Sequence, residues 1–146
     1  MEKIPVKILK VDKELPTPAY KHHGDAGMDL FSSETFAIKP GEIKKAKTGV
    51  RFAIPFGYEI QLRPRSGLAS NHGISIINTP CTIDAGYRGD IDIPLINHGK
   101  ETYEIKRGER IAQAVLKKVE IAELIEVDEL DDTARGESGF GSTGKF

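Results

Sequence analysis

Apolar and polar residues alternate with a period of two along much of the chain, which is typical of β-strands with one buried face. In "YEIQLR" (58–63), Tyr58, Ile60 and Leu62 share one face, and the polar residues between them share the other. The same alternation occurs in other short segments: "VKILKV" (6–11), "FAIKP" (36–40), "VRFAIP" (50–55), "GISIIN" (73–78) and "DIDIPLIN" (90–97). These segments are rich in β-branched residues, so we predict that each forms a short strand.

Turn-forming residues separate the predicted strands. The chain has 8 prolines and 15 glycines, and short strands between closely spaced turns are typical of a sandwich, a jelly roll or a barrel. We therefore predict an all-β fold, a jelly-roll-like β-barrel, with at most one short helix. The segment "SGLASN" (66–71) could form that helix, with Ser66 as its N-cap and Gly73 beyond its end.

One stretch, "ERIAQAVLKKVEIAELIEV" (109–127), carries conflicting signals. Its Ala, Leu, Glu and Lys residues favour a helix. Ile111, Gln113 and Val115 alternate with other residues, and Val119 and Ile121 continue the same phase. We predict strands here because the alternation is sustained.

Length and charge restrict the class of protein. The chain has 146 residues, of which 38% are hydrophobic and 29% charged, as expected for one globular domain with its own core. A formal net charge of −1 provides no basic field for long nucleic acid. The only cysteine is Cys81, and we find neither a signal-peptide core nor a membrane-spanning apolar run. We expect a cytoplasmic protein without a nucleic-acid or membrane partner.

The C-terminal residues differ from the rest of the chain. An acidic stretch, "EVDELDD" (126–132), leads into the glycine-rich "TARGESGFGSTGKF" (133–146). The glycine-rich segment has too few apolar residues to form a core of its own. It is either a disordered tail or a flexible arm that orders over an anionic ligand, for which its backbone N–H groups and hydroxyls are suitable donors. We predict a β-barrel domain over residues 1–134 and an arm over residues 135–146.

Several short stretches combine glycine bends with polar or charged side chains. Each stretch alone is explained by ordinary turns and surface charges. Together they form an ordered series: "AGMDL" (26–30), "PRSGLAS" (64–70), "NTPCTIDAGYRGD" (78–90), "RGERIAQ" (107–113) and "RGESGFGSTG" (135–144).

In this order and spacing, the series resembles the five motifs of the homotrimeric dUTPase family, from about Pro16 to Gly144. The resemblance implies hydrolysis of dUTP to dUMP and pyrophosphate with Mg²⁺, which keeps uracil out of DNA and supplies dUMP for thymidylate synthesis. It also implies a homotrimer whose active sites are shared between subunits. The chain departs from the family pattern at Cys81 and Ser138, where glycine is usual or frequent.

The third motif contains the residues expected at the base and sugar. A carboxylate beside a substrate can orient a water molecule and accept its proton, and the resemblance assigns this role to Asp84, for attack on the α-phosphate. The alternative for Asp84 is a turn-capping acid. The resemblance places Tyr87 under the deoxyribose, where its ring leaves no space for a 2′-hydroxyl; the alternative is a core tyrosine.

Uracil recognition is expected from one side chain and several backbone groups. The amide of Asn78 offers both a donor and an acceptor, as does the pairing edge of uracil. The resemblance adds backbone groups of Thr82, Ile83 and Asp92.

The phosphates require cations and hydrogen-bond donors. Arg65, Ser66 and Gly67 lie where a helical turn is expected to begin, which is a favourable anion site. The resemblance adds Gln113 and places Asp29 near the metal, acting through water or by supporting the base. From the arm, it implies Arg135 at the phosphates, Phe140 stacked on uracil, and Gly141, Ser142 and Thr143 around the γ-phosphate.

Other functions remain open on the sequence alone. A dCTP deaminase or a bifunctional relative has a similar architecture but usually lacks the tyrosine found here as Tyr87. A non-catalytic nucleotide-binding β-trimer would have no need of Asp84 or of the arm. A broad nucleotide pyrophosphatase would accept dTTP and UTP as well as dUTP.

Overall fold

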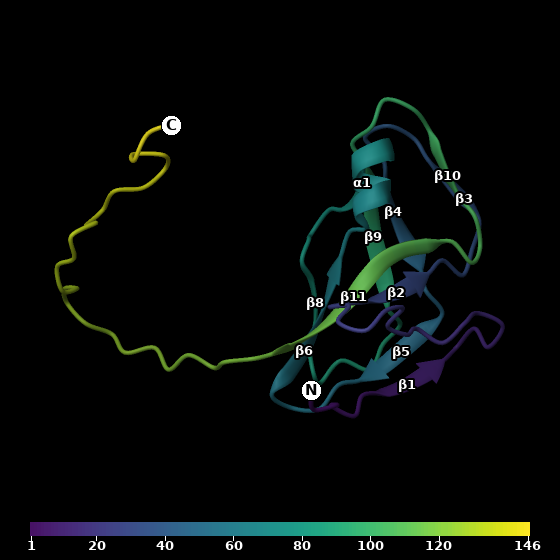
Figure 1. Cartoon of the computed structure of the whole chain (residues 1–146), viewed down its shortest axis with the longest axis horizontal. Coiled ribbons are helices and arrows are strands. Elements are labelled where there is room, and N and C mark those ends of the chain that lie inside the picture. Colours follow the sequence, from purple (N-terminus) through teal and green to yellow (C-terminus); the bar gives the residue numbers. More distant parts are fainter.

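The computed structural model describes all residues from Met1 to Phe146. It consists of short strands and a single short helix (Figure 1). In chain order the elements are β1 (Lys7–Lys10), β2 (Met28–Phe31), β3 (Phe36–Ile38), β4 (Ile43–Lys47), β5 (Val50–Ala53), β6 (Tyr58–Arg63), α1 (Ser66–His72), β7 (Ile74–Ile76), β8 (Cys81–Ile83), β9 (Asp92–Asn97), β10 (Tyr103–Ile105) and β11 (Arg110–Lys118).

The strands pair in antiparallel fashion and form separate sheets. The larger sheets have the orders β2-β11-β6-β8 and β4-β9-β7, and two ribbons, β1-β5 and β10-β3, complete the body. The core is a cluster of 20 buried residues drawn from both larger sheets, with Ile60, Leu62, Ile93 and Leu95 among its least exposed members. The all-β, jelly-roll-like prediction is confirmed, with the strands in distinct sheets rather than one closed barrel.

Most predicted strands are present. Strand β6 spans the predicted residues 58–63, and Ile60 and Leu62 on its apolar face are buried as expected. The strands β2, β4 and β10 were not predicted. Strand β4, "IKKAK", contains three lysines, a composition that suits its position at the edge of a sheet.

The helix prediction is correct in position but wrong in its N-cap. Ser66 is the first helical residue, and Arg65 occupies the N-cap with an extended backbone and no side-chain hydrogen bond to the helix. Gly73 ends the helix with a φ of 69°, and its N–H donates to the carbonyl of Ala69. A Cβ at Gly73 would lie 2.6 Å from the backbone nitrogen of Gly99, so both the backbone conformation and the close approach favour glycine.

The alternation predicted for residues 109–127 is wrong in two places. A bulge between Arg110 and Ala112 shifts the register of β11 against β2, so that Ile111 and Ala112 are both buried while Gln113 is exposed. The strand ends at Lys118, and the predicted continuation through Val119 and Ile121 is not a strand.

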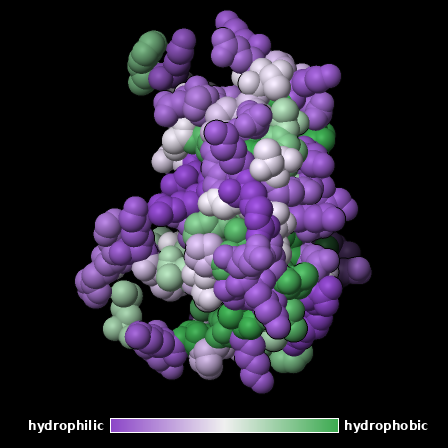
Figure 2. Space-filling model, turned by 90° about the vertical axis from the view of Figure 1, so that its right-hand side faces the viewer, coloured by the Kyte–Doolittle hydropathy of each residue, from purple (hydrophilic) through white to green (hydrophobic).

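Residues 119–146 contain no helix or strand and lead away from the body (Figure 1). They expose several large apolar side chains, including Ile121, Leu124, Ile125 and Phe140. Elsewhere, apolar side chains gather toward the end of the body that carries β1 and β5 (Figure 2), where Leu9 and Val11 are more than half exposed. No helix in the structure combines the length and apolar character needed to cross a bilayer.

Candidate active site

A cavity of about 510 Å³ lies between β8 and β9, and we call it the hairpin cavity. Strand β8 pairs with β6, whereas β9 pairs with β4 and β7. The two strands are consecutive in the chain but belong to different sheets, so the 84–91 bend that joins them spans an opening rather than a closed hairpin. The sequence-predicted residues on its wall are Asn78, Thr82, Ile83, Asp84, Tyr87 and Asp92.

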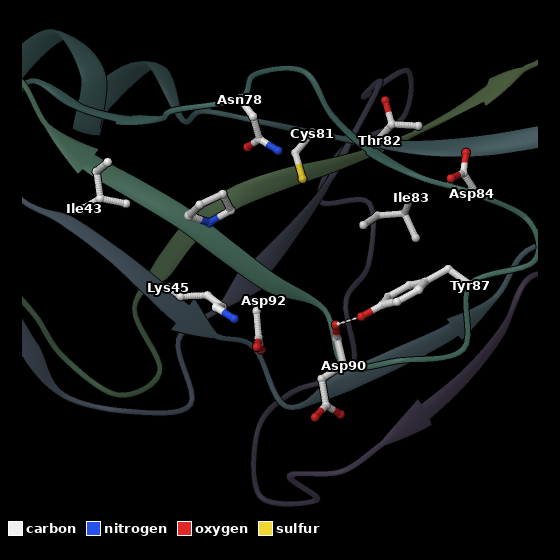
Figure 3. A pocket seen from close by; sticks show the side chains of 11 residues that line it. Ile43, Lys45, Asn78, Cys81, Thr82, Ile83, Asp84, Tyr87, Asp90 and Asp92 are labelled. Atoms are coloured by element: carbon white, nitrogen blue, oxygen red, sulfur yellow. Dashed lines mark hydrogen bonds between the residues drawn. The ribbon is translucent and has the colours of Figure 1, made fainter.

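Asp84 and Tyr87 lie on this bend, at the rim of the hairpin cavity (Figure 3). The N–H of Tyr87 donates to the carbonyl of Asp84 over 3.1 Å, which holds the two residues in one turn. Asp84 is exposed, and its carboxylate forms no hydrogen bond or ion pair within the chain. It is therefore free to bind a water molecule or a ligand.

The ring of Tyr87 is fixed at its hydroxyl end. That hydroxyl donates to the carbonyl of Asp90 over 2.8 Å (Figure 3), and 44% of the residue remains exposed. A Cβ at Gly89 would collide with this hydroxyl, whereas one at Gly86 would meet nothing within 4 Å. Of the two glycines, Gly89 is the one that the ring position requires.

The opposite walls of the hairpin cavity differ in character. Asn78, Cys81 and Thr82 lie on one side, and Lys45 and Asp92 lie on the other (Figure 3). Cys81 is a free, buried cysteine, and it lines the cavity. Its Cβ and sulfur therefore occupy space at the cavity that a glycine would leave open.

A second cavity, of about 280 Å³, surrounds Asp29, and we call it the Asp29 cavity. Two guanidinium groups face this carboxylate: Arg65 Nε lies 3.3 Å from Oδ1 and Arg110 Nη1 lies 3.6 Å from Oδ2. Arg65 Nη1 also donates to the carbonyl of Arg110 over 3.3 Å. Gln113 completes the sequence-predicted part of the wall. It pairs with Asp29 on β2 and with Arg63 on β6.

The Asp29 cavity has an unsatisfied acceptor and an excess of cations. Oδ1 of Asp29 is buried and accepts no hydrogen bond, because its contact with Arg65 is an ion pair without hydrogen-bond geometry. Lys21 also lines the cavity. The two guanidinium groups and a carboxylate oxygen that still lacks a hydrogen bond suit a ligand that carries both phosphate and a hydrated cation.

Three basic residues that line the cavities were not identified from the sequence as site residues. Lys45 lines the hairpin cavity, and Lys21 and Arg110 line the Asp29 cavity. Arg110 stands three residues before Gln113 in the same motif, and this position was an available signal. Lys45 lies on β4, far from the third motif in sequence, and only the packing of β4 against β9 brings it to the hairpin cavity.

The remaining predicted residues lie outside both cavities. Ser66 and Gly67 are exposed in the first turn of α1, and a Cβ at Gly67 would meet nothing within 4 Å. Phe140, on the arm, is fully exposed with a φ of 52°. The single chain does not bring the predicted site residues together. It separates them into the hairpin cavity, the Asp29 cavity with the start of α1, and the arm.

An all-β fold with two polar cavities is compatible with several classes of protein, and comparison with known proteins gives the family. The family model for dUTPase matches residues 13–144, so the chain belongs to the dUTPase family. It is 59% identical over 140 residues to the deoxyuridine 5′-triphosphate nucleotidohydrolase of Nautilia profundicola, covering 96% of this chain and 99% of that protein. The protein of the same name from Zymomonas mobilis is 53% identical, with 97% of each chain covered.

Solved structures agree with the family assignment. The dUTPase of Staphylococcus bacteriophage 80alpha, determined with dUPNHPP, superposes with a TM-score of 0.90 at 32% identity, covering 98% of this chain and 100% of that chain. A mutant dUTPase of the S. aureus phage phi11, whose structure describes the coordination of a structural Mg(II) ion, has a TM-score of 0.79 at 29% identity. That match covers 86% of this chain and 98% of the other.

Proposed function

We propose that this protein hydrolyses dUTP to dUMP and pyrophosphate, and so supplies dUMP for thymidylate synthesis and keeps uracil out of DNA. The observation that carries the proposal is the opening between β8 and β9, with the free carboxylate of Asp84 at its rim. Membership of the dUTPase family supports the same activity.

Asp84 acts as the general base. Its carboxylate accepts a proton from a water molecule while the water oxygen bonds to the α-phosphorus. The bond from that phosphorus to the bridging oxygen breaks, and pyrophosphate leaves with the bonding electron pair. The absence of competing hydrogen bonds at Asp84 supports this role, because nothing in the chain has to be displaced before a water molecule can bind.

The hairpin cavity binds the nucleoside. The Asn78 amide and backbone groups of Thr82, Ile83 and Asp92 form hydrogen bonds with the edge of uracil. Tyr87 packs under the deoxyribose and excludes a 2′-hydroxyl by direct collision, since an apolar surface that only fails to solvate a hydroxyl discriminates weakly.

The phosphate chain is bound by the residues around Asp29 and α1. Arg65 and Gln113 line the Asp29 cavity, and Ser66 and Gly67 offer a hydroxyl and a backbone N–H at the start of α1. No group of three or more His, Cys, Asp or Glu residues in the chain could hold a metal ion. Mg²⁺ would therefore be bound mainly by phosphate oxygens and water, with the unsatisfied Oδ1 of Asp29 accepting from one of its waters. When bound, the ion neutralises charge on the phosphates.

We further propose a homotrimer with shared active sites. The separation of the predicted residues within one chain supports this, because no single copy assembles a complete site. One subunit provides the hairpin cavity, a second the residues around Asp29, and a third the arm (135–146). On the arm, Arg135 contacts phosphate, Phe140 stacks on uracil, and Gly141, Ser142 and Thr143 surround the γ-phosphate. Residues 1–134 form the jelly-roll-like domain in this proposal, and all of its strands lie before residue 119.

We propose a cytoplasmic location, which the single free cysteine fits because reduced thiols persist there.

Product analysis tests the proposed reaction. The protein is incubated with Mg²⁺ and either dUTP, dCTP, dTTP or UTP, and the products are separated by chromatography. We expect dUMP and pyrophosphate from dUTP and little reaction with the others. Formation of dUTP from dCTP would instead identify a deaminase. Similar kcat/KM values for dTTP or UTP would identify a broad pyrophosphatase, and no turnover at all a non-catalytic binding protein.

A further inference from the structure

The bend of residues 84–91 joins β8 to β9, and it also forms polar contacts with β5. Arg51 Nε on β5 lies 2.7 Å from Oδ1 of Asp90, and the N–H of Ile91 donates to the carbonyl of Val50 over 3.0 Å. Two neighbouring residues of β5 thus hold two neighbouring residues at the end of the bend. One contact is made by the backbone and the other by side chains.

Asp90 connects this attachment to the Tyr87 ring. Its carboxylate faces Arg51, and its backbone carbonyl accepts the hydrogen bond from the Tyr87 hydroxyl. Packing alone does not immobilise the ring, because 44% of Tyr87 is exposed. The position of the Asp90 carbonyl therefore determines where the hydroxyl end of the ring lies, and Gly89 provides the space for it.

The Arg51–Asp90 pair contributes orientation rather than stability. The side chains are 45% and 55% exposed, and ion pairs at such exposure contribute little to folding. The hydrogen bond to the Asp90 carboxylate raises the pKa of Arg51, and an arginine guanidinium is protonated at any working pH even without such a partner. No other hydrogen bond or ion pair involves the Asp90 carboxylate, so loss of Arg51 would leave it unrestrained.

We infer, on the basis of the proposed hydrolysis of dUTP, that Arg51 is a positioning residue for sugar discrimination. The backbone hydrogen bond from Ile91 to Val50 already restrains the peptide group that carries the Asp90 carbonyl, and Arg51 adds a second restraint through the Asp90 side chain. Together they hold the Tyr87 ring as a rigid wall beneath the sugar. A 2′-hydroxyl is excluded by collision only if the Tyr87 ring keeps its position when the sugar presses against it. A ring free to tilt would admit a ribonucleotide while still accepting a deoxyribonucleotide.

The test compares kcat/KM for dUTP and UTP in four variants of the full chain: Arg51→Ala, Arg51→Lys, Asp90→Asn and Lys7→Ala. We expect Arg51→Ala to lower the dUTP-to-UTP ratio roughly fivefold, the factor that an exposed ion pair can supply, with kcat for dUTP almost unchanged. Asp90→Asn should lower the ratio by a smaller factor, because the amide oxygen can still accept from Arg51 Nε. Arg51→Lys should restore most of the ratio. Lys7→Ala is the matched control, because it removes an exposed cation from the same β1–β5 ribbon that forms no ion pair, and it should leave the ratio unchanged.

A second measurement reports on the ring itself. Aromatic NMR signals of labelled tyrosine, with Tyr87 assigned through a Tyr87→Phe variant, should shift or broaden in Arg51→Ala and Asp90→Asn but not in Lys7→Ala. This readout needs no turnover, and Asp90→Asn preserves the size of the side chain if Arg51→Ala fails to fold.

Three outcomes would overturn the positioning role. The first is an unchanged ratio with unchanged Tyr87 signals. The second is an equal fall in kcat/KM for both nucleotides, which would make Arg51 a substrate contact. The third is a changed ratio without any change at the ring. Failure of the proposed function is distinguishable from all of these, because it would appear as absence of dUTP hydrolysis in the unsubstituted protein.

Discussion

Replacement of Asp84 by Asn separates catalysis from folding and binding. The side chain is exposed and its carboxylate forms no hydrogen bond or ion pair, so the amide leaves no buried group unpaired and the melting temperature should change very little. The amide retains the size of the carboxylate but cannot accept the proton of the attacking water. General-base catalysis contributes a factor of about 10²–10⁴, so we expect kcat to fall by that factor, a rise of about 3–5 kcal/mol in the barrier.

The assay has three parts: release of dUMP and pyrophosphate, calorimetric binding of a non-hydrolysable dUTP analogue, and thermal unfolding. Binding should change by no more than a few fold, because loss of one charge at the rim leaves the hairpin cavity in place. Glu104→Gln is the control, since Glu104 is another exposed carboxylate without a hydrogen bond and lies on β10, away from both cavities. Turnover of Asp84→Asn within a few fold of the unsubstituted protein would show that Asp84 is not the base.

Other predictions address the arm, the core and pH. Deletion of residues 135–146 should leave a folded protein that binds nucleotide weakly and turns over very slowly; an unchanged kcat would refute the proposed role of the arm. Asn97→Ala should lower the free energy of unfolding by about 3–5 kcal/mol in denaturant titrations, because the buried amide donates to the carbonyls of Ile38 and Glu101 and accepts from the N–H of Gly99; a loss below about 1 kcal/mol would contradict this. Burial and a hydrogen bond to Glu109 raise the pKa of Tyr103 to about 12. Its stabilising contribution should be complete below pH 10 and lost between pH 10 and 12, and Tyr103→Phe should remove this loss from pH-dependent thermal unfolding.

Local patterns were sufficient to predict much of the fold. The alternation in residues 58–63 predicted both the strand β6 and its buried face, because a strand with one buried face needs apolar residues at every second position. Gly73 was predicted at the end of the helix for an equally local reason, the left-handed conformation that a helix C-terminus commonly requires.

Predictions failed where a residue depends on distant parts of the chain. The prediction that Ile111 and Gln113 share one face of the strand was wrong. The bulge against β2 turns two consecutive residues, Ile111 and Ala112, toward the core, and Gln113 is exposed. The apolar alternation at Val119 and Ile121 suggested a strand, but a strand requires a pairing partner. The N–H of Val119 still donates to the carbonyl of Gly57 over 2.9 Å, and no backbone pairing continues beyond it within the chain.

The sequence by itself determined the chemistry of this protein. It contains the residues that can provide a general base, an aromatic ring, an amide and cations, and its motifs follow the order that indicates a dUTPase. Their spatial grouping was decided only by the tertiary structure. Whether β8 and β9 close on each other or open into a cavity depends on the strands with which they pair, β6 for β8 and β4 and β7 for β9, and not on the segment that joins them. The same is true of the contact between Arg51 and Asp90, because hydrogen bonds between remote strands depend on register and packing that no local pattern specifies.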